Sequence, residues 1–303
     1  MKKLSLCISA FLLLQASPPP SNTAIELSGS WQEKNLVYKS KNHDFCDYSI
    51  RVDFGSTVGY NGPPSPYVAV ISSGEMPLFT LRWDGTTSVK PAFTYYIVRG
   101  NLHKKPNVEF LYALPVKQGD SVRVATKDER NYTLRFDLQH ASDTVYACRG
   151  GIVCDNRLVD TSTKGKYDRP DKITIYHHND GTMADYTIDK DCLVKKIVSP
   201  GDNVKVGDPI AVVKAVSASR SGSDKSMKNK EVSVGIYFLD KNKLYNTETG
   251  SKHTNFVPVF HTTKGGLKLL PKTTYCCEIT DQMLITDMGK REKSQYFKNK
   301  TKK

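Results

Sequence analysis

Residues 173–213, ITIYHHNDGTMADYTIDKDCLVKKIVSPGDNVKVGDPIAVV, decide the fold that we predict for this chain. Residues 173–176 alternate between apolar and polar side chains, which is typical of a half-buried strand. Asn179-Asp180-Gly181 indicates a hairpin turn, because an Asp-Gly pair supplies the positive φ that a tight turn needs. Further short apolar runs follow at residues 183–188, 193–198 and 210–213. Short strands joined by Gly and Asp turns, with no helix-length pattern between them, predict a compact all-β unit.

Two motifs in this stretch, read together with a run upstream, carry a resemblance. The first is His178-x-Asp180-Gly181-Thr182 followed by Tyr186, and the second is Gly201-Asp202-x-Val204-x-x-Gly207-Asp208-x-Ile210. Lipoyl and biotinyl carrier domains also use the second motif. With the hairpin motif and with residues 144–153 upstream, however, it resembles the core of the lysostaphin/LytM-type zinc metallopeptidases. The resemblance covers residues 130–240 and implies a β-barrel of the barrel-sandwich hybrid kind.

The rest of the chain also reads as β-structure, so the predicted fold class is all-β. From residue 31 to 116 the pattern favours short strands at sandwich-like spacing, with no helix signal. We therefore expect a β-sandwich-like domain at residues 25–120, followed by the LytM-like β domain at 130–240. Late β segments at 241–288 are expected to pack on either domain, and a basic tail occupies 289–303.

The resemblance implies a definite set of zinc ligands, which we place on this sequence by their neighbours. In the family, the metal is held by a His and an Asp four residues apart and by one His of a His-x-His strand, and two further histidines assist the reaction. The aspartate position falls on Asp137. The four histidine positions fall on Thr133, Ile188, Glu231 and Ser233.

These replacements remove most of the chemistry that a zinc hydrolase needs, namely three metal ligands, an open position for water and a base. Threonine and serine hydroxyls are poor zinc ligands, and Ile188 cannot accept a proton. We therefore expect no catalytic residues, no bound metal and no cofactor. Asp137 is the only retained ligand position, and His178, Asp180 and Tyr186 remain as candidates for residues of the hairpin and of a former substrate groove.

The predicted function follows from this loss. We expect an exported, catalytically inactive metallopeptidase-like protein that binds cell-wall peptide, peptidoglycan or an envelope protein. One alternative is an active zinc endopeptidase that cleaves peptidoglycan peptides, with zinc as its cofactor and its ligands elsewhere. Another is a structural envelope or interaction protein that uses only its β surfaces.

The N-terminus predicts export to the periplasm or the cell exterior. Met1-Lys2-Lys3 is a charged start, residues 4–14 are apolar, and Ala16 is a small residue suited to cleavage, so we expect a signal peptide over residues 1–16, with Ala24 as a later limit. No apolar run reaches the length of a transmembrane segment.

Export permits disulfides among the six cysteines that follow the leader. Residues 148–154 could close a hairpin through their two cysteines, with Gly150-Gly151 as the turn. Alternatively, several of the cysteines are free buried thiols, and the pairing stays open. The set is Cys46, Cys148, Cys154, Cys192, Cys276 and Cys277.

The chain is basic, with a net charge of +13, and seven Lys or Arg against one Glu lie in residues 290–303. Such a run is either a solvated tail or a means of attraction to an anionic surface. We expect no nucleic-acid partner, because no recognition motif is present. His43 and His103 are isolated and read as surface or hydrogen-bonded histidines.

Overall fold

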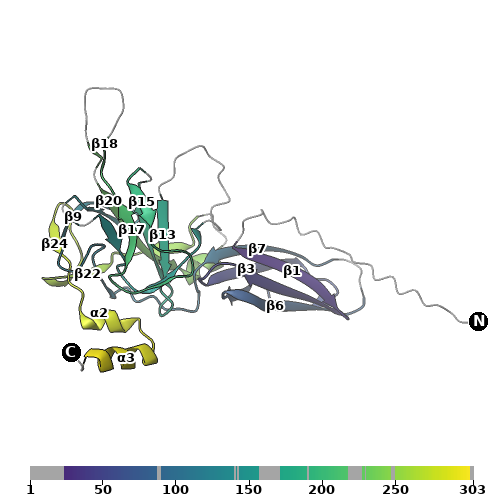
Figure 1. The fold of residues 1–303 in the computed structure, drawn as a ribbon. Coiled ribbons are helices and arrows are strands. Elements are labelled where there is room, and N and C mark those ends of the chain that lie inside the picture. The colour runs from purple at the N-terminus through teal and green to yellow at the C-terminus, as the bar shows by residue number, and fades with distance from the viewer. Residues whose placement is uncertain are drawn as a thin grey trace, which may run out of the picture.

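The computed structural model describes residues 24–86, 90–139, 141, 143–156, 171–189, 191–217, 227–228, 230–246 and 250–300. Strands dominate the described chain, which confirms the all-β prediction. Figure 1 shows a smaller N-terminal body beside a larger body built from the rest of the chain. The predicted signal peptide lies outside the described residues.

The N-terminal body consists of two antiparallel sheets that share one hydrophobic core. One sheet has the order β1-β2-β6-β4 and the other the order β5-β3-β7. Leu36, Ile50 and Leu81 are fully buried between them, and Tyr38 stacks on Phe79 with 4.7 Å between ring centroids. The strands are β1 Ile25–Gln32, β2 Asn35–Asn42, β3 Tyr48–Ser56, β4 Tyr60–Asn61, β5 Tyr67–Ile71, β6 Gly74–Trp83 and β7 Ala92–Arg99.

The larger body is organised around a nine-stranded sheet. Its order is β16-β12-β13-β14-β20-β10-β9-β24, and β21 also pairs with β20. The strands are β9 Ser121–Asp128, β10 Thr133–Asp137, β12 Gly151–Val153, β13 Asp171–Tyr176, β14 Thr182–Ile188, β16 Asn203–Val204, β20 Glu231–Leu239, β21 His253–Asn255 and β24 Thr274–Cys276.

Smaller sheets complete this body. β11-β17-β15 and β23-β22-β8 are three-stranded, and β18 pairs with β19. Their bounds are β8 Leu111–Tyr112, β11 Thr144–Tyr146, β15 Leu193–Lys196, β17 Pro209–Val213, β18 Val216–Ser217, β19 Met227–Lys228, β22 Val259–Thr262 and β23 Gly265–Leu267.

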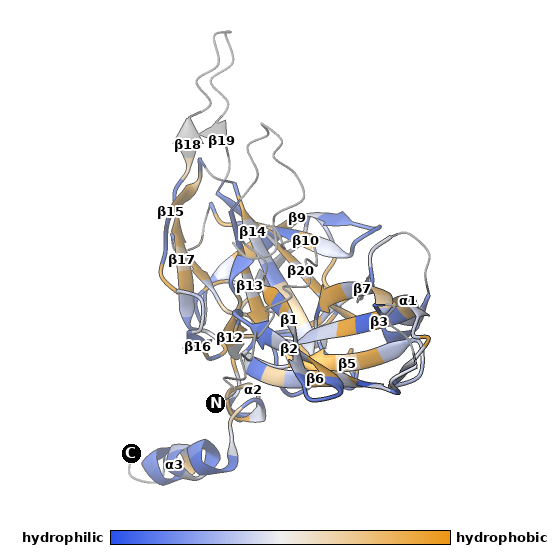
Figure 2. Ribbon diagram, turned by 90° about the vertical axis from the view of Figure 1, so that its right-hand side faces the viewer, coloured by the Kyte–Doolittle hydropathy of each residue, from blue (hydrophilic) through white to orange (hydrophobic). Residues whose placement is uncertain are grey.

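The strands of the large sheet bury one face in the core of the larger body. The other face is polar at one end, and at the other end its Tyr176 and Met183 are buried against the N-terminal body. Along β20, Val232, Val234 and Ile236 are fully buried, whereas the residues between them are half-buried. Phe136 and Phe260 fill the same core, with their ring centroids 5.8 Å apart. Figure 2 shows this mixture of hydrophobic and hydrophilic residues along the strands. A sheet with one polar face has a surface available for binding.

The division between the two bodies differs from the predicted one. β8 pairs with β22, and β9 pairs with β10 and β24, so residues 111–128 belong to the larger body. The first body therefore ends near Arg99 and not at residue 120. Alternation within a strand predicts which face is buried, but it does not show which distant strand lies alongside.

Three helices lie where the prediction has late strands or a tail. α1 spans Lys241–Tyr245, α2 Asp281–Thr286 and α3 Lys290–Lys300. Asp240 caps α1 by accepting from the backbone N–H of Asn242, and Thr280 caps α2 at Met283. Because such caps satisfy first-turn N–H groups, they favour helix over strand locally. None of the described helices is long and apolar enough to cross a bilayer.

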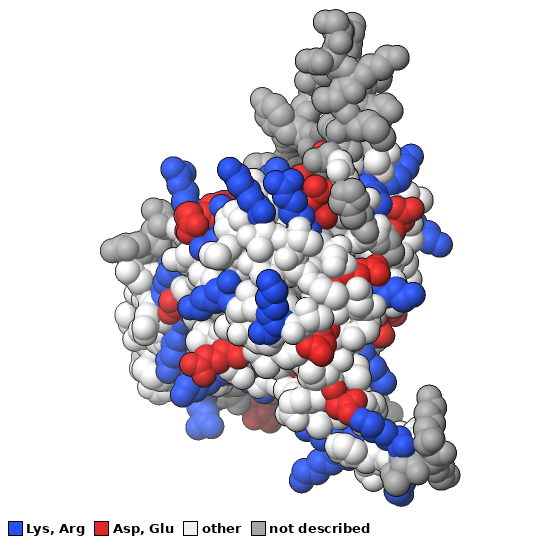
Figure 3. Space-filling model, turned by 90° about the vertical axis from the view of Figure 1, so that its left-hand side faces the viewer, with Lys and Arg blue, Asp and Glu red and all other residues white. Residues whose placement is uncertain are grey.

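The basic tail is a helix that projects from the body (Figure 1), and none of the α3 residues is buried. On the face drawn in Figure 3, the Lys and Arg side chains of the described residues are interspersed with Asp and Glu. The positive charge is therefore spread over this face of the molecule.

The hairpin that residues 148–154 could have closed, one of the alternatives left open by the sequence, does not form. β11 pairs with β17, whereas β12 pairs with β13 and β16, so the two strands belong to different sheets. Cys148 lies in the core of the larger body and Cys154 in that of the N-terminal body. The alternative in which a disulfide between Cys148 and Cys154 closes a hairpin is therefore wrong.

Candidate functional site

Four of the five positions at which the resemblance places the zinc chemistry lie on one face of the large sheet. β10 and β20 are neighbours, with Asp137 opposite Glu231 and Arg135 opposite Ser233. Residues opposite each other on paired strands share a face, and Thr133 lies two residues from Arg135 on the same side. Ile188 is the exception, because it points into the core and is 1% exposed.

A row of polar side chains crosses five strands on this face. Thr126 lies opposite Arg135, Arg135 opposite Ser233, Ser233 opposite Thr187, and Thr187 opposite Lys172. All five are half-buried or exposed. We call Thr126, Arg135, Ser233, Thr187 and Lys172 the polar row. Four inter-strand spacings make it about 19 Å long.

Ion pairs balance the charges beside the row. Arg135 Nη1 lies 3.5 Å from Glu231 Oε2, and Lys172 Nζ lies 2.9 Å from Asp185 Oδ2. Partial burial raises the pKa of Glu231; Arg135 opposes this shift and Asp137 adds to it. Arg135 is 53% exposed, so its pairing with Glu231 is a weak surface interaction that a ligand can replace.

The residues on this face do not fit a zinc ion. They offer the carboxylates of Asp137 and Glu231, two hydroxyls and the guanidinium of Arg135, whereas zinc sites in proteins are built mainly from histidine and cysteine with carboxylates. Asp137 Oδ1 instead accepts from the backbone N–H of Gln139 at 3.0 Å, as a turn cap. Within the described ranges, the one cluster of three potential metal ligands is Asp44, Cys46 and Cys154, which is not on this face.

His178 and Asp180, the candidates from the hairpin, lie at a second location. A pocket of about 380 Å³ is lined by the β13–β14 turn, by Gly150 and Gly151, and by residues of α2 and α3. His178 lines this pocket, and its pKa is lowered, first by burial and further by Lys104, against the opposing effect of Asp47. The C-terminal helices thus close one wall of a pocket at the hairpin.

Asp180 is held by a buried arginine that the sequence analysis did not single out. Arg149 Nη1 donates to Asp180 Oδ2 at 2.8 Å, and Thr182 donates to Oδ1 through both its backbone N–H and its hydroxyl. Burial alone would raise the pKa of Asp180, but Arg149 and Thr182 outweigh it and lower the pKa. Asp180 is therefore ionised and serves to fix the turn.

Arg149 has further partners, and its Nη1 also donates to the hydroxyl of Thr182 at 3.1 Å. Its guanidinium lies 3.6 Å from the ring centroid of Phe110 and pairs with Asp287, which follows α2. The feature of the sequence that marks this site is the pair Gly150-Gly151, which directly follows Arg149. A Cβ on Gly151 would lie 2.5 Å from the carbonyl oxygen of Tyr176, so this backbone must approach β13 closely.

His177 and Tyr186 are core residues. His177 Nδ1 lies 2.8 Å from the carbonyl oxygen of Gly150, which assigns the proton to Nδ1, and burial together with Arg149 lowers the pKa of His177 to about 3. Tyr186 is fully buried and its hydroxyl accepts from the backbone N–H of Cys148 at 2.7 Å. Tyr186 thus supports the core beneath the hairpin and does not line the pocket.

Comparison with known proteins adds a distant likeness. No protein-family model matches the chain, and no curated protein matches it. A solved structure that resembles it is a putative glycyl-glycine endopeptidase LytM from Ruminococcus gnavus ATCC 29149, with 14% identity and a TM-score of 0.25. The match covers 46% of this chain and 57% of that chain, a little over half of its length. A likeness this distant says nothing about the activity of the present protein.

Proposed function

We propose that this chain is an exported, catalytically inactive metallopeptidase-like protein that binds a cell-wall peptide or an envelope protein on the polar face of its large sheet. The observation that carries the proposal is the placement of Thr133, Asp137, Glu231 and Ser233. These positions share one accessible sheet face, yet they offer hydroxyls and carboxylates where the resemblance calls for histidines.

The chemistry of this face suits a peptide that carries both kinds of charge, because the cations of the row lie beside the carboxylates of Glu231 and Asp185. Arg135 and Lys172 supply cationic donors, and the hydroxyls of Ser233 and Thr187 lie between them in the polar row. At about 19 Å, the row has the length of roughly six extended residues. A peptide carries both amides and carboxylates, so this row can pair with both kinds of group.

Export of the chain is part of the proposal and rests on its first residues. The charged start, the apolar run of residues 4–14 and Ala16 together favour a cleaved leader. The ligand is then a component of the envelope, which the protein meets after export.

Co-sedimentation with purified peptidoglycan tests this function. Arg135→Glu reverses the charge of one of the two cationic residues of the row and is expected to weaken binding about tenfold, which corresponds to about 1.4 kcal/mol. Lys39→Glu is the matched control, because Lys39 is also exposed and also pairs with a glutamate, Glu75, on the N-terminal body. Lys39→Glu is expected to change binding less than twofold.

Three outcomes would overturn the proposal. Near one zinc per purified chain by elemental analysis, with soluble peptides released from cell wall, would establish the active zinc endopeptidase. Equal binding by wild type and Arg135→Glu would show that the polar row is not the binding surface. Absence of any binding to cell wall, with the fold intact, would favour the structural envelope protein.

A further inference from the structure

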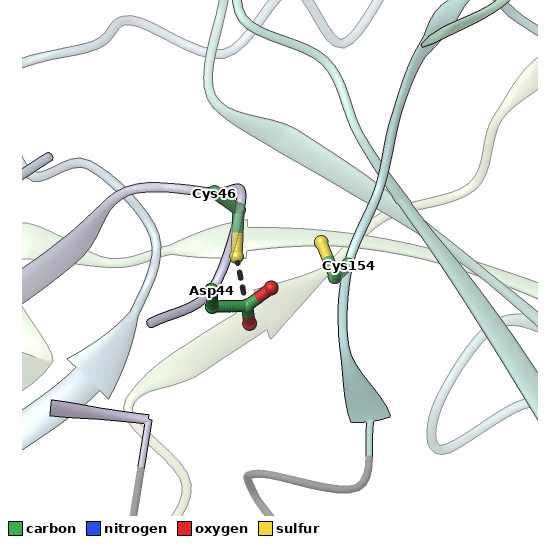
Figure 4. Close-up of side chains that lie close together, drawn as sticks. All are labelled: Asp44, Cys46 and Cys154. Atoms are coloured by element: carbon green, nitrogen blue, oxygen red, sulfur yellow. Dashed lines mark hydrogen bonds between the residues drawn. The ribbon is translucent and has the colours of Figure 1, made fainter. Parts of the chain in front are cut away.

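A buried group of three side chains lies where the N-terminal body meets the larger one. Asp44 and Cys46 lie in the turn between β2 and β3, and Cys154 directly follows β12. Cys46 is 1% exposed and Cys154 is 2% exposed. The two sulfur atoms and a carboxylate oxygen of Asp44 all lie within 4.8 Å of one another (Figure 4).

Asp44 has no capacity left for a metal ion. Its Oδ1 accepts from the backbone N–H groups of Phe45 and Asp155, at 2.8 and 2.7 Å. Its Oδ2 accepts from the hydroxyl of Tyr48 at 2.8 Å, from Arg99 Nη2 at 2.6 Å and from the Cys46 thiol at 3.3 Å. A carboxylate has about four lone-pair positions, and all of them are in use.

Arg99 adds a second argument against a cation. Its side chain is only 6% exposed and pairs with Asp44 inside the group. A divalent metal bound by the two sulfurs would lie beside this buried guanidinium, and repulsion between like charges is strong away from water. The pair of cysteines therefore has a charge environment that suits neutral sulfur.

We propose that Cys46 and Cys154 form a disulfide that joins the two bodies of the protein. The sulfurs need to approach from within 4.8 Å to about 2.05 Å, which rotation of the two short side chains can supply. The two residues are 108 positions apart in the chain, so the bond would close a long loop and restrict the unfolded chain. It would also fix the contact between the bodies by a covalent bond, beside the ion pair of Arg99 with Asp44, the hydrogen bond of Tyr176 with Asp47 and the apolar packing of Met183.

The oxidant is a disulfide compound, such as oxidised glutathione, which reacts by thiol–disulfide exchange. One cysteine thiolate attacks the oxidant, forming a mixed disulfide and releasing one thiol. The second thiolate then attacks the protein sulfur, forming the Cys46–Cys154 bond and releasing the second thiol. The two protons lost by the cysteines are taken up by the two released thiolates, and the two electrons reduce the oxidant. Burial raises the pKa of the Cys46 thiol, so little of the reactive thiolate is present once the protein has folded. The exchange therefore takes place during folding, before the two cysteines are buried.

Peptide mapping of the full-length protein tests the proposal. The protein is unfolded in reductant, refolded with oxidised and reduced glutathione, alkylated and digested. We expect a peptide pair joined through Cys46 and Cys154, two hydrogens lighter than the sum of the reduced peptides. Cys46→Ala should abolish this species, whereas Cys276→Ala, the matched control at a half-buried cysteine on β24, should leave it unchanged.

Thermal unfolding gives a second readout. Oxidised wild type should have a melting temperature at least about 5 °C above that of the reduced protein, given the size of typical disulfide effects, and Cys46→Ala should show no such difference. Complete alkylation of both cysteines after refolding would overturn the proposal, as would a joined peptide from another pair only. If Cys46→Ala does not fold, the mapping of wild type decides alone.

Discussion

Arg149 and Asp287 lie 138 positions apart and form a two-pronged ion pair, with Nε to Oδ2 at 3.1 Å and Nη2 to Oδ1 at 3.0 Å. The same guanidinium holds Asp180 in the β13–β14 turn. One buried cation thus fastens the hairpin to the segment that follows α2. The wall of the adjacent pocket depends on this connection.

Replacing Arg149 by methionine should strongly destabilise the protein. The side chain of Asp180 is 7% exposed and would lose its cation, and a buried charge without a partner costs about 3–5 kcal/mol. Urea unfolding of Arg149→Met measures this loss. Arg135→Met, at an exposed surface pair, should cost less than about 1 kcal/mol, and a similar small loss for Arg149→Met would show that the Arg149 pairs do not hold the fold.

His177 should make stability depend on pH. An unfolded histidine titrates near pH 6.5, whereas the folded pKa is about 3, so between these values the unfolded chain binds one more proton. The free energy of unfolding should therefore fall as pH falls from 6.5 towards 3, by up to about 1.4 kcal/mol for each pH unit.

The variant His177→Asn isolates this contribution. Asparagine keeps a donor for the carbonyl of Gly150 but does not titrate, so the pH slope should become smaller by the amount due to His177. His103→Asn, at an exposed histidine, should retain the wild-type slope. Unfolding curves at several pH values between 4 and 7 give the comparison, and parallel curves for wild type and His177→Asn would contradict it.

Gly151 should not tolerate a side chain. An added Cβ would lie 2.5 Å from the Tyr176 carbonyl oxygen and 2.7 Å from Ile175 Cγ2, and overpacking of this kind costs about 1–3 kcal/mol. Gly55→Ala is the matched control, since the nearest atom to its Cβ is 3.6 Å away, and it should change stability by less than about 0.5 kcal/mol. Equal stability of the two variants would disprove the close approach.

The two C-terminal helices should differ in their contribution to stability. Deletion of residues 289–303 removes α3, in which no residue is buried, so the melting temperature should stay within about 2 °C of the wild-type value. Deletion of residues 280–303 also removes Asp287 and the buried side chain of Met283, and should lower the melting temperature by about 5 °C or more. Equal melting temperatures for the two truncated chains would show that α2 does not support the fold.

Local signals predicted the central hairpin correctly. Asp180-Gly181 marks the turn, Gly181 has a φ of +72°, and β13 pairs with β14 on either side of it. The apolar run at residues 183–188 was also predicted, and β14 spans Thr182–Ile188. Both results follow from neighbours in the chain, whose geometry the sequence pattern reflects directly.

Contacts between distant segments were not predictable in the same way. Nothing near Arg149 in the sequence indicates Asp287, and nothing near Cys46 indicates Cys154. The placement of Thr133, Asp137, Glu231 and Ser233 on one face came from a family resemblance and not from the pattern. Ile188 shows the limit of the family resemblance. Side chains alternate between the two faces along β14, and this alternation places Ile188 on the core side of the sheet.

The pairing of β24 with β9 and of β22 with β8 has a consequence for the order in which the chain becomes available during synthesis. Residues 111–128 leave the ribosome about 150 residues before the segments that cover them. Until Cys276 has been made, β9 has one unpaired edge, and such an edge attracts other strands. The larger body therefore cannot close while the chain is still growing. A chain that is exported must cross the membrane, or be kept from associating with other chains, while this edge of β9 is still unpaired.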